Sequence, residues 1–597
     1  IRFIDSFKFM ATSLDSLVSN LPKDSFENLT NNYEGEKLQL LLRKGVFPYD
    51  WFDSFSRLSS TGLPPKEMFY SKLNDSDISD EDYTHAKKVW ETFEMKTMRE
   101  YHDLYLKSDV LLLADVFENF RDVCLENYGL DPAWYYTAPG LAWDAALKLT
   151  RVELELLTDY DMLLMIETGI RGGVSMISGR YGEANNKYMS SYDPEKPSKF
   201  ITYLDANNLY GWAMSQPLPT SGFRWMNDGE LNDWENCPCI LEVDLKYPDN
   251  LHDLHNDYPL APEPVEINKV QKLIPNLRDK TKYIIHHETL KLYIRLGLRV
   301  TKIHRGITFR EDAWLKPYID LNTNLRAKAT NDFEKDFFKL MNNSVFGKTM
   351  ENIRNRVDIR LVTNEKDAKK LISKPNYQHR NIFCDNLVAI HMKKTKLVFN
   401  KPVYLGMSIL DLSKTLMYKF HYKYIKSKYG ERAKLLFTDT DSLCYEIATP
   451  DFYKDISQDI KSMFDTSNYP KDHPSGIETG VNKKVIGMFK DEVCGGQITE
   501  FVGLRAKLYA YKMDSGGQEK KCKGVKKGVV KKCISFDDYK KCLFSQETQM
   551  RQMNVIRSHN HEIYTETVNK VALSHLDDKR IIHEDGIHTY AYGHYKV

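Results

Sequence analysis

Apolar residues recur every three to four positions along three stretches of the chain, and this spacing predicts amphipathic helices. The stretches are residues 101–117, residues 321–355, which predict one continuous helix, and residues 403–428, which end before Gly430. Residues 227–281 are polar and contain several prolines, so we expect a long interruption of regular structure there. The glycine-rich stretch 169–173 indicates a junction inside a domain boundary that we place between residues 138 and 199.

Two further patterns predict strands. Residues 200–205 form a short apolar run that ends in Asp205, as expected of a buried strand. In residues 433–447 two apolar runs flank Thr-Asp-Thr-Asp, and the second run alternates, which predicts a β-hairpin. Asp439 and Asp441 therefore lie at the tip of a tight hairpin.

Composition indicates a multidomain globular protein. The 597 residues contain 84 Lys and Arg against 83 Asp and Glu, and the length suits several domains. No apolar run reaches the ~18 residues of a membrane helix, so we expect no membrane association. The chain begins with Ile1 rather than Met and lacks the features of a signal peptide, so we expect a fragment whose N-terminus is missing.

The nine cysteines are scattered, which predicts a reducing, intracellular setting. Cys237 and Cys239 form the only close pair and lack two further ligands nearby, so a zinc site is not expected there. Adjacent histidines such as His286 and His287 are more often core or surface residues than metal ligands.

One segment is strongly basic. Residues 519–532 contain seven lysines and a single acid. The pattern fits either a solvated lysine-rich hairpin or a surface that contacts nucleic-acid phosphates.

Three carboxylates, Asp205, Asp439 and Asp441, gather at strand ends if the two predicted strand units are neighbours. Crowded carboxylates repel one another and are stabilised by divalent cations. Two Mg²⁺ ions would suit an in-line phosphoryl transfer from a nucleoside triphosphate, and a helix face with Lys339 and Asn343 would supply a cation for the triphosphate. A lone Asp-x-Asp is more often a simple Asx turn, so this interpretation depends on the order and spacing of other motifs.

Four motifs in order resemble those of family B DNA polymerases. They are Asp205-Ala-Asn-Asn-Leu-Tyr-Gly211, Lys339-Leu-Met-Asn-Asn-Ser-Val-Phe-Gly347, Thr438-Asp-Thr-Asp-Ser442 and Lys507-Leu-Tyr509. The resemblance implies a right-hand polymerase of α+β class, with palm, fingers and thumb, preceded by a partial ribonuclease-H-like 3′–5′ exonuclease domain. It also implies primer–template DNA and deoxynucleoside triphosphates as partners and two Mg²⁺ ions as cofactors, with Mn²⁺ as an alternative.

The resemblance implies a role for each matched residue. Asp205 and Asp441 would bind both metals, and Asp439 would complete the catalytic set. Tyr210 would exclude a ribose 2′-hydroxyl. The nucleotide-binding residues would be Tyr210, Arg326, Lys339, Asn343 and Phe346, and the DNA-binding residues would be Arg171, Gly172, Gly173, Lys507, Tyr509, Lys523, Lys526 and Lys527.

A second set resembles the proofreading domain of the same family. Arg2-Phe-Ile-Asp5 is similar to the end of the second exonuclease motif, and Tyr105-Leu-Lys-Ser-Asp109 to the third. Asp5 and Asp109 would be metal ligands, and Tyr105 would orient the attacking water. The first motif, D-x-E, is absent, so we expect this chain to proofread poorly.

The long segments between motifs resemble the insertions of the protein-primed branch, and residues 401–414 and 584–595 resemble polymerases of Maverick/Polinton-type elements and related viruses. That likeness implies a terminal-protein primer, strand displacement, and a nuclear or viral-factory location. The expected divisions are exonuclease 1–150, junction 151–199, palm 200–221 and 402–512, fingers 308–355, inserts 222–307 and 356–401, and thumb 513–597.

Some positions depart from the family pattern. Asn208 replaces Ser, Gly211 replaces Pro, and Phe346 and Phe437 stand where Tyr is common. None removes an expected metal ligand, so we predict an active DNA polymerase. Two alternatives remain: a DNA-binding relic of a mobile element that no longer polymerises, and a reverse transcriptase or RNA polymerase palm.

Overall fold

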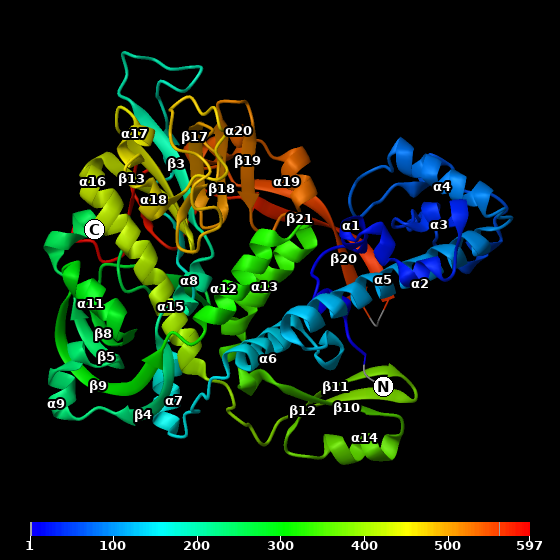
Figure 1. Ribbon diagram of the computed structural model, residues 1–597, viewed down its shortest axis with the longest axis horizontal. Coiled ribbons are helices and arrows are strands. Elements are labelled where there is room, and N and C mark those ends of the chain that lie inside the picture. The colour runs from blue at the N-terminus through cyan, green and yellow to red at the C-terminus, as the bar shows by residue number, and fades with distance from the viewer. Residues whose placement is uncertain (1–2, 560–561) are drawn as a thin grey trace.

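The computed structural model describes residues 3–559 and 562–597. The N-terminal helices lie at one end of an elongated molecule, and the mixed sheets lie toward the other (Figure 1). The four-stranded sheet of residues 218–312 is at the far end, and the six-stranded sheet that carries Asp205 lies above it in the view of Figure 1. No helix in the described residues is long and apolar enough to cross a membrane.

The N-terminal region is helical. The predicted helix at residues 101–117 is confirmed and extends over Met98–Tyr128, where Thr97 and Glu100 form a capping box at its start. Before β1, the described residues contain no strand, only an isolated bridge between Ser71 and Ser76. The helices are α1 (Leu14–Asn20), α2 (Glu27–Thr30), α3 (Gly35–Leu41), α4 (Asp80–Thr92), α5 (Met98–Tyr128), α6 (Ala138–Thr150) and α7 (Tyr160–Thr168).

A buried carboxylate joins two of these helices. Asp115 of α5 is 2% exposed and accepts hydrogen bonds from the backbone N–H of Asn28 (2.7 Å) and of Leu29 (3.1 Å). It also accepts a bond from the Asn28 side chain (2.8 Å). The free N–H groups at the start of α2 therefore have a charged acceptor, which compensates for the burial of the carboxylate.

The same long helix also packs against the two helices within residues 316–349. Phe120 of α5 packs edge-on against Phe337, with ring centroids 4.9 Å apart. Tyr128 donates a hydrogen bond to Asn322 (2.6 Å), and Asn322 donates to Asn342 (2.9 Å), all within the core. This buried polar chain fixes the N-terminal region against residues 316–349.

The prediction of one helix over residues 321–355 is wrong. The structure has two, α12 (Lys316–Lys328) and α13 (Asp332–Thr349). Asn331 lies between them, and its side chain accepts a hydrogen bond from the backbone N–H of Glu334 (2.8 Å). An Asn followed by acidic residues is an N-cap signal, and it starts a new helix here despite the continuous apolar spacing.

The six-stranded sheet contains both predicted strand units, which the structure confirms. Its order is β1-β13-β14-β3-β16-β15, and β14 pairs antiparallel with β3. A helix from Val403 to Tyr418 (α15) continues as a π-helical segment to Lys426, close to the predicted helix end. The strands are β1 (Ser175–Ile177), β3 (Lys199–Ala206), β13 (Ala433–Asp439), β14 (Ser442–Ala448), β15 (Phe464–Asp465) and β16 (Phe489–Asp491).

The expected interruption at residues 227–281 is also wrong, because this segment contains the central strand β5 of a second sheet and a separate hairpin, β6–β7. The sheet has the order β4-β9-β5-β8, and apolar residues of β5 such as Leu241 and Val243 are fully buried. The elements are β4 (Leu218–Trp225), α9 (Asp228–Asn232), β5 (Cys239–Lys246), α10 (His252–His255), β6 (Glu263–Ile267), β7 (Val270–Ile274), β8 (Lys280–His286), α11 (His287–Arg295) and β9 (Arg299–Asp312).

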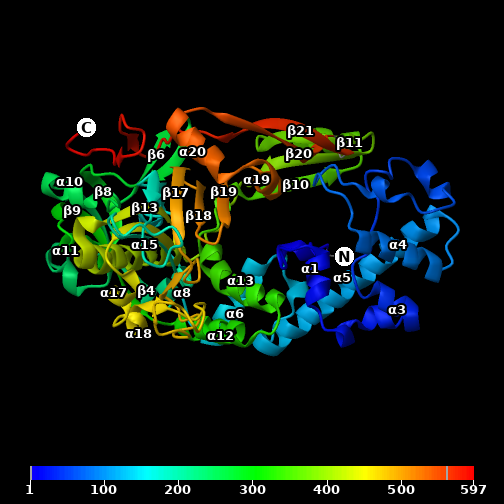
Figure 2. The ribbon, with the colours of Figure 1, turned by 90° about the horizontal axis from the view of Figure 1, so that it is seen from above.

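Two smaller units complete the chain. Residues 357–393 form a three-stranded sheet of order β10-β12-β11 with one helix. The C-terminal part has a four-stranded sheet of order β19-β18-β17-β2 and a long hairpin, β20–β21, that reaches toward the N-terminal region (Figure 2). Lys526, which lies between β19 and α19, also contacts the N-terminal region by donating a hydrogen bond to the carbonyl of Leu73 (3.3 Å).

The bounds of these remaining elements are as follows: α8 (Leu209–Met214), β10 (Val357–Val362), α14 (Glu365–Ile372), β11 (Tyr377–Cys384), β12 (Leu387–Lys393), α16 (Ser427–Tyr429), α17 (Phe452–Ile456), α18 (Ile460–Met463), β2 (Tyr181–Glu183), β17 (Ile498–Arg505), β18 (Leu508–Met513), β19 (Gln518–Cys522), α19 (Lys527–Cys533), α20 (Phe536–Ser545), β20 (Gln549–His559), β21 (Glu562–Leu573), β22 (Ile581–Ile582) and β23 (Thr589–Tyr590).

We predict that Asp115→Ala destabilises the N-terminal region by about 2–3 kcal/mol, because the buried N–H of Leu29 and the partly buried N–H of Asn28 lose their acceptor. Hydrogen exchange at the amides of residues 28 and 29 should accelerate, and the urea midpoint of this region should fall. Asp122→Ala, an exposed aspartate on the same helix, is the matched control and should change neither. Unchanged exchange in Asp115→Ala would contradict the assigned role.

Candidate active site

Three aspartates meet at one edge of the six-stranded sheet. Asp205 lies near the end of β3, directly opposite Ser442 of β14, and Asp439 pairs with Ser442 from the other side. The backbone N–H of Ala206 donates a hydrogen bond to the carbonyl of Asp441 (2.7 Å). Strand pairing therefore places Asp205 beside the turn that carries Asp439 and Asp441.

When both are ionised, Asp205 and Asp441 carry like charges that repel each other. Burial, followed by the nearby Asp441 and Glu492 carboxylates, raises the pKa of Asp205. Burial also raises the pKa of Asp441, with a further contribution from Asp439. Lys339 acts in the opposite direction on both groups. Carboxylates held together in this way suit a divalent cation, which would neutralise them and favour their ionised forms.

The oxygen donors fit a hard ion such as Mg²⁺. Among the described residues, a group of three side chains whose potential ligand atoms all lie within 4.8 Å of one another occurs elsewhere, at His286, His287 and Glu311. The carboxylate oxygens of the three aspartates do not come as close to one another as these atoms do.

The turn of the hairpin is held from below by the glycine-rich junction. Thr440 has a positive φ of 66°, and its backbone N–H donates to the carbonyl of Val174 (2.7 Å). A Cβ atom added at Gly173 would lie 2.5 Å from two side-chain atoms of Thr440. At Gly172 an added Cβ would meet nothing within 4 Å. Gly173 therefore lets the junction approach the hairpin closely.

Arg171 differs from its predicted role. Its side chain is only 7% exposed, and its guanidinium donates a hydrogen bond to the carbonyl of Ile284 (2.7 Å) and stacks over the ring of Tyr283. We therefore correct the expectation that this side chain contacts DNA: its charge is used inside the protein, where it joins the junction to β8.

Asn208 and Gly211, the two departures from the family pattern in the first motif, depend on each other. Asn208 adopts a left-handed conformation (φ 44°), and its side chain accepts a hydrogen bond from the backbone N–H of Gly211 (3.3 Å). A Cβ at position 211 would lie 2.1 Å from the Asn208 amide nitrogen. Asn208 thus caps α8, and Gly211 gives its side chain the space to do so.

An aromatic pair stands beside the carboxylates. The ring of Tyr210 on α8 lies 4.4 Å from that of Phe346 on α13, at an angle of 31°. Burial, with smaller effects of Asp441 and Asp439, raises the pKa of the Tyr210 hydroxyl to about 12. The hydroxyl is therefore protonated at neutral pH and near the charged groups.

The predicted nucleotide-binding residues of the two helices occupy different positions. Lys339 is exposed on α13, and together with Asn343 it lines a pocket of about 320 Å³ beside residues 9–12. Asn343 Oδ1 is buried and has no hydrogen-bond partner among the described residues. Arg326 belongs to α12, not to the helix of Lys339, and burial lowers the pKa of its guanidinium. Its Nε is buried and likewise has no partner in the described part of the chain.

Lys507 and Tyr509 approach the carboxylates from the four-stranded sheet β19-β18-β17-β2, where Lys507 precedes β18 and Tyr509 belongs to it. Lys507 Nζ is 3.2 Å from Asp439 Oδ1. Tyr509 is 4% exposed, and its ring stacks on Phe437 of β13 with centroids 4.3 Å apart. The aromatic at position 437, which replaces the usual Tyr, is thus a packing surface for Tyr509. Because its ring is buried, Tyr509 positions β18 rather than offering a broad surface to a ligand.

The basic segment, residues 519–532, contains exposed lysines as well as lysines that donate hydrogen bonds to the N-terminal region. Lys523 and Lys527 are exposed, whereas Lys526 is partly buried. Lys526 and Lys532 donate to the carbonyls of Leu73 and Asp75 in the N-terminal region. The segment is not a simple hairpin, because α19 starts at Lys527.

The predicted exonuclease residues are only partly brought together. Tyr105 and Asp109 lie one turn apart on α5, and Lys44 contacts both, with its Nζ 2.7 Å from Asp109 Oδ2. Asp5 is exposed and caps its own short helical turn by accepting a bond from the N–H of Phe7 (3.0 Å). Arg2, the first residue of that motif, lies outside the described residues.

Sequence reasoning missed two charged residues near the aspartates and a third near Arg326. Glu492 raises the pKa of both Asp205 and Asp441. Lys490 lies opposite Asp205 in β16 and lowers the pKa of Asp205. Burial, followed by the nearby Arg326 guanidinium, lowers the pKa of Lys484. No motif marks them, because β16 is short and joins the sheet through pairing with a strand almost 300 residues earlier.

Three aspartates meet at the edge of a mixed sheet, where Lys339 acts on two of them and Lys507 pairs with the third. This arrangement fits a nucleic-acid polymerase of the right-hand class. The chain belongs to the family of type B DNA polymerases, organellar and viral, whose model matches residues 1–427. It is therefore a DNA-directed DNA polymerase of α+β multidomain fold, in a family that uses divalent metal ions.

Solved structures support the fold. The chain is similar to Phi29 DNA polymerase complexed with primer–template DNA and incoming nucleotides, with a TM-score of 0.50 and 15% identity over 89% of this chain and 79% of that one. An orthorhombic crystal form of the Phi29 enzyme gives 0.50 and 14% over the same shares. No curated protein matches the chain by sequence.

We predict that Gly173→Ala lowers the rate of primer extension by about 10²-fold, because the new methyl group displaces the hairpin that carries Asp439 and Asp441. Gly62→Ala adds the same methyl group in open space in the N-terminal region and should retain the parent rate. Thr440→Gly removes the colliding atoms and suits the positive φ, so the double variant should recover most of the activity. Equal rates for the two alanine variants would refute the close-approach argument.

Proposed function

We propose that the chain extends a primer 3′-hydroxyl on a DNA template by two-metal phosphoryl transfer. The observation that carries the proposal is the pairing of β3 with the β13–β14 hairpin, which sets Asp205 beside Asp441. Two Mg²⁺ ions, or Mn²⁺, would be held by these two side chains. When bound, the ions supply activation of the attacking hydroxyl and stabilisation of the leaving oxygen. Asp439, paired with Lys507, orients the hairpin and shapes the local field.

The incoming deoxynucleotide would lie between α8 and α13. The Tyr210–Phe346 pair offers a rigid aromatic surface beside the aspartates, which leaves no room for a ribose 2′-hydroxyl. Lys339 and the unpaired guanidinium nitrogen of Arg326 would contact the triphosphate. Asn343, whose carbonyl oxygen lacks a partner among the described residues, would contact the nascent base pair.

The DNA would run along the C-terminal sheet. Lys507 is near the catalytic edge, and the exposed Lys523 and Lys527 have no acidic partner among the described residues, so they are free to contact phosphates. Gly172 offers an open backbone at the junction, and Gly173 beside it supports the hairpin. Solved Phi29 structures with primer–template DNA make this class of ligand the natural expectation.

We also propose protein-primed, strand-displacing replication of a mobile or viral element, with a terminal protein as primer and a nuclear or viral-factory location. The support is the sequence likeness of residues 401–414 and 584–595 and the presence of two folded units, residues 218–312 and 357–393, between the motifs. Deletion of residues 357–393 should abolish synthesis through duplex DNA while extension on a single-stranded template persists.

We further propose weak 3′–5′ exonuclease activity in this chain. Lys44 neutralises Asp109, and Asp5 is used as a cap, so the three predicted residues do not form a cluster of carboxylates comparable to the palm site. Divalent ions prefer oxygen donors that are not already paired with a lysine.

The deciding experiment is primer extension with Mg²⁺ and all four deoxynucleotides. Asp205→Asn and Asp441→Asn should each lower the rate by at least about 10³-fold, since each removes a metal-binding charge. Asp472→Asn, at an exposed aspartate of the same region, should extend like the parent. An inactive parent that still binds duplex DNA would instead favour the DNA-binding relic of a mobile element.

The proposal of weak exonuclease activity is tested by omitting the deoxynucleotides. Degradation of the primer as fast as the parent extends it would contradict weak proofreading.

We predict that Tyr210→Ala raises incorporation of ribonucleotides relative to deoxynucleotides by about 10²-fold, because the ring that would exclude the 2′-hydroxyl is gone. Tyr210→Phe keeps the ring and should keep the discrimination. Single-nucleotide insertion kinetics with matched ribo- and deoxynucleotides measure the ratio. If Tyr210→Phe lost discrimination as fully as Tyr210→Ala, the hydroxyl rather than the ring would be the determinant.

A further inference from the structure

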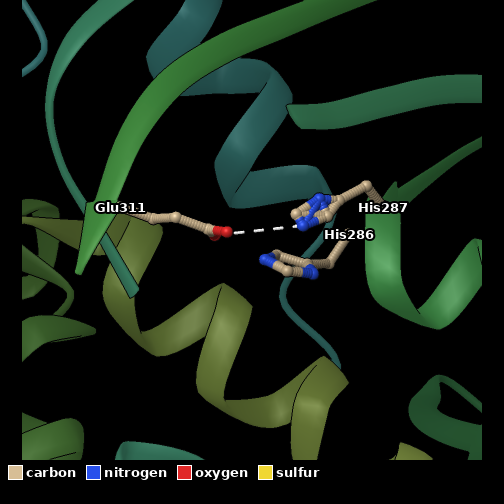
Figure 3. Close-up of side chains that lie close together, drawn as sticks. All are labelled: His286, His287 and Glu311. Atoms are coloured by element: carbon tan, nitrogen blue, oxygen red, sulfur yellow. Dashed lines mark ion pairs between the residues drawn. The ribbon is translucent and has the colours of Figure 1, made fainter. Parts of the chain in front are cut away.

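Two histidines and a glutamate converge inside the four-stranded sheet unit, away from the aspartates of the palm. His286 is the last residue of β8, His287 is the first residue of α11, and Glu311 lies near the end of β9. One ligand atom from each side chain lies within 4.8 Å of the other two. Figure 3 shows the two imidazole rings side by side, with the carboxylate of Glu311 directed toward them.

The two rings are buried, and neither Nε2 atom has a close hydrogen-bond partner among the described residues. His286 is 1% exposed, and its Nε2 has no hydrogen-bond partner among the described residues. His287 is 3% exposed, and its Nε2 is 3.9 Å from the nearest carboxylate oxygens, those of Glu311 and Glu288. Buried polar nitrogens without a partner carry a free-energy cost that a bound ligand would remove.

The donor set suits a metal ion. Imidazole nitrogens and carboxylate oxygens are common metal ligands in proteins. Among the described residues Glu311 has no ion pair with a lysine or arginine, whereas the neighbouring Glu288 pairs with Lys291 at 2.9 Å. The Glu311 carboxylate is therefore not already neutralised by a lysine.

We propose that His286, His287 and Glu311 bind one divalent transition-metal ion, for which Zn²⁺ is the best match. Two imidazole nitrogens and one carboxylate oxygen form a ligand set that zinc accepts in proteins. The fourth position is open to water or to Glu288, whose carboxylate already lies beside His287. Nitrogen donors distinguish this site from the palm, where the oxygen donors suit Mg²⁺.

Binding at the two Nε2 atoms has an identifiable cost. At present His286 Nδ1 accepts from the backbone N–H of Glu288 (3.3 Å), and His287 Nδ1 accepts from that of Cys239 (3.4 Å). Zinc at Nε2 requires the ring proton on Nδ1, so both long contacts are given up. Zinc-binding histidines usually donate from that nitrogen to an acceptor, and the absence of this support predicts micromolar rather than nanomolar affinity.

The ion would connect three elements of the sheet unit to the palm. Glu311 belongs to β9, while His286 and His287 join β8 to α11. The backbone N–H of His286 donates to Asp411 on α15 (3.0 Å), a buried carboxylate of the long palm helix. A bound ion would therefore restrain the start of α11 against both β9 and α15. The role is structural, and it is independent of the proposed polymerase chemistry.

The test uses Zn²⁺ alone and the full chain carrying Asp205→Asn and Asp441→Asn, so that the palm does not compete. Titration against a chromophoric chelator gives stoichiometry and affinity, and zinc-edge X-ray absorption reports imidazole ligands directly. We expect one zinc per chain with two imidazole ligands. His287→Asn and the isosteric Glu311→Gln should each weaken binding by more than about tenfold.

The matched control is His379→Asn. His379 and His391 also stack, with centroids 4.0 Å apart, and the metal-ligand group of the described residues does not include them. This variant should bind zinc like its parent. Circular dichroism of Glu311→Gln checks that the fold persists. Equal zinc affinity in the parent, His287→Asn and Glu311→Gln, or an absorption spectrum without imidazole scattering, would overturn the proposal.

Discussion

The arrangement of the palm depends on holding two like charges together. Asp205 and Asp441 would separate if their mutual repulsion were the only interaction, and the raised pKa of each shows that burial already opposes their ionisation. The strand pairing supplies the restraint, because the N–H of Ala206 is bonded to the carbonyl of Asp441. Gly173 adds a second restraint by packing under Thr440. The positive φ of Thr440 persists because these surrounding contacts determine it.

Departures from the family pattern are compensated by neighbouring residues. Asn208 needs the space above Gly211 to cap α8, so these two changes belong together. Phe346 lacks a hydroxyl but keeps the ring that stacks on Tyr210. Phe437 likewise keeps the ring on which Tyr509 packs. Aromatic contact area is therefore retained at both positions, while hydrogen-bonding capacity is lost.

Local patterns predicted the strand that ends in Asp205, the hairpin of Asp439 and Asp441 and the core of α5, because each is encoded by a short apolar period. The break at Asn331 does not show in the apolar spacing, although the capping residue itself is a local signal for it. The sheet unit of residues 218–312 was missed for another reason, since its strands pair across long loops. Long-range placement also explains the burial of Arg171 and the meeting of Glu311 with His286, neither of which leaves a pattern in the sequence.

The chain neutralises its carboxylates in two different ways, and the difference separates the candidate sites. Asp109 has the Lys44 ammonium at 2.7 Å, and Asp439 has Lys507 at 3.2 Å. Among the ion pairs of the described residues, none includes Asp205 or Asp441, although both are largely buried. Lys339 acts on them only at longer range. A lysine placed directly on either aspartate would neutralise it permanently and compete with any divalent ion. Because these two side chains have no lysine partner among the described residues, their charge would be available to the divalent ions of the proposed reaction.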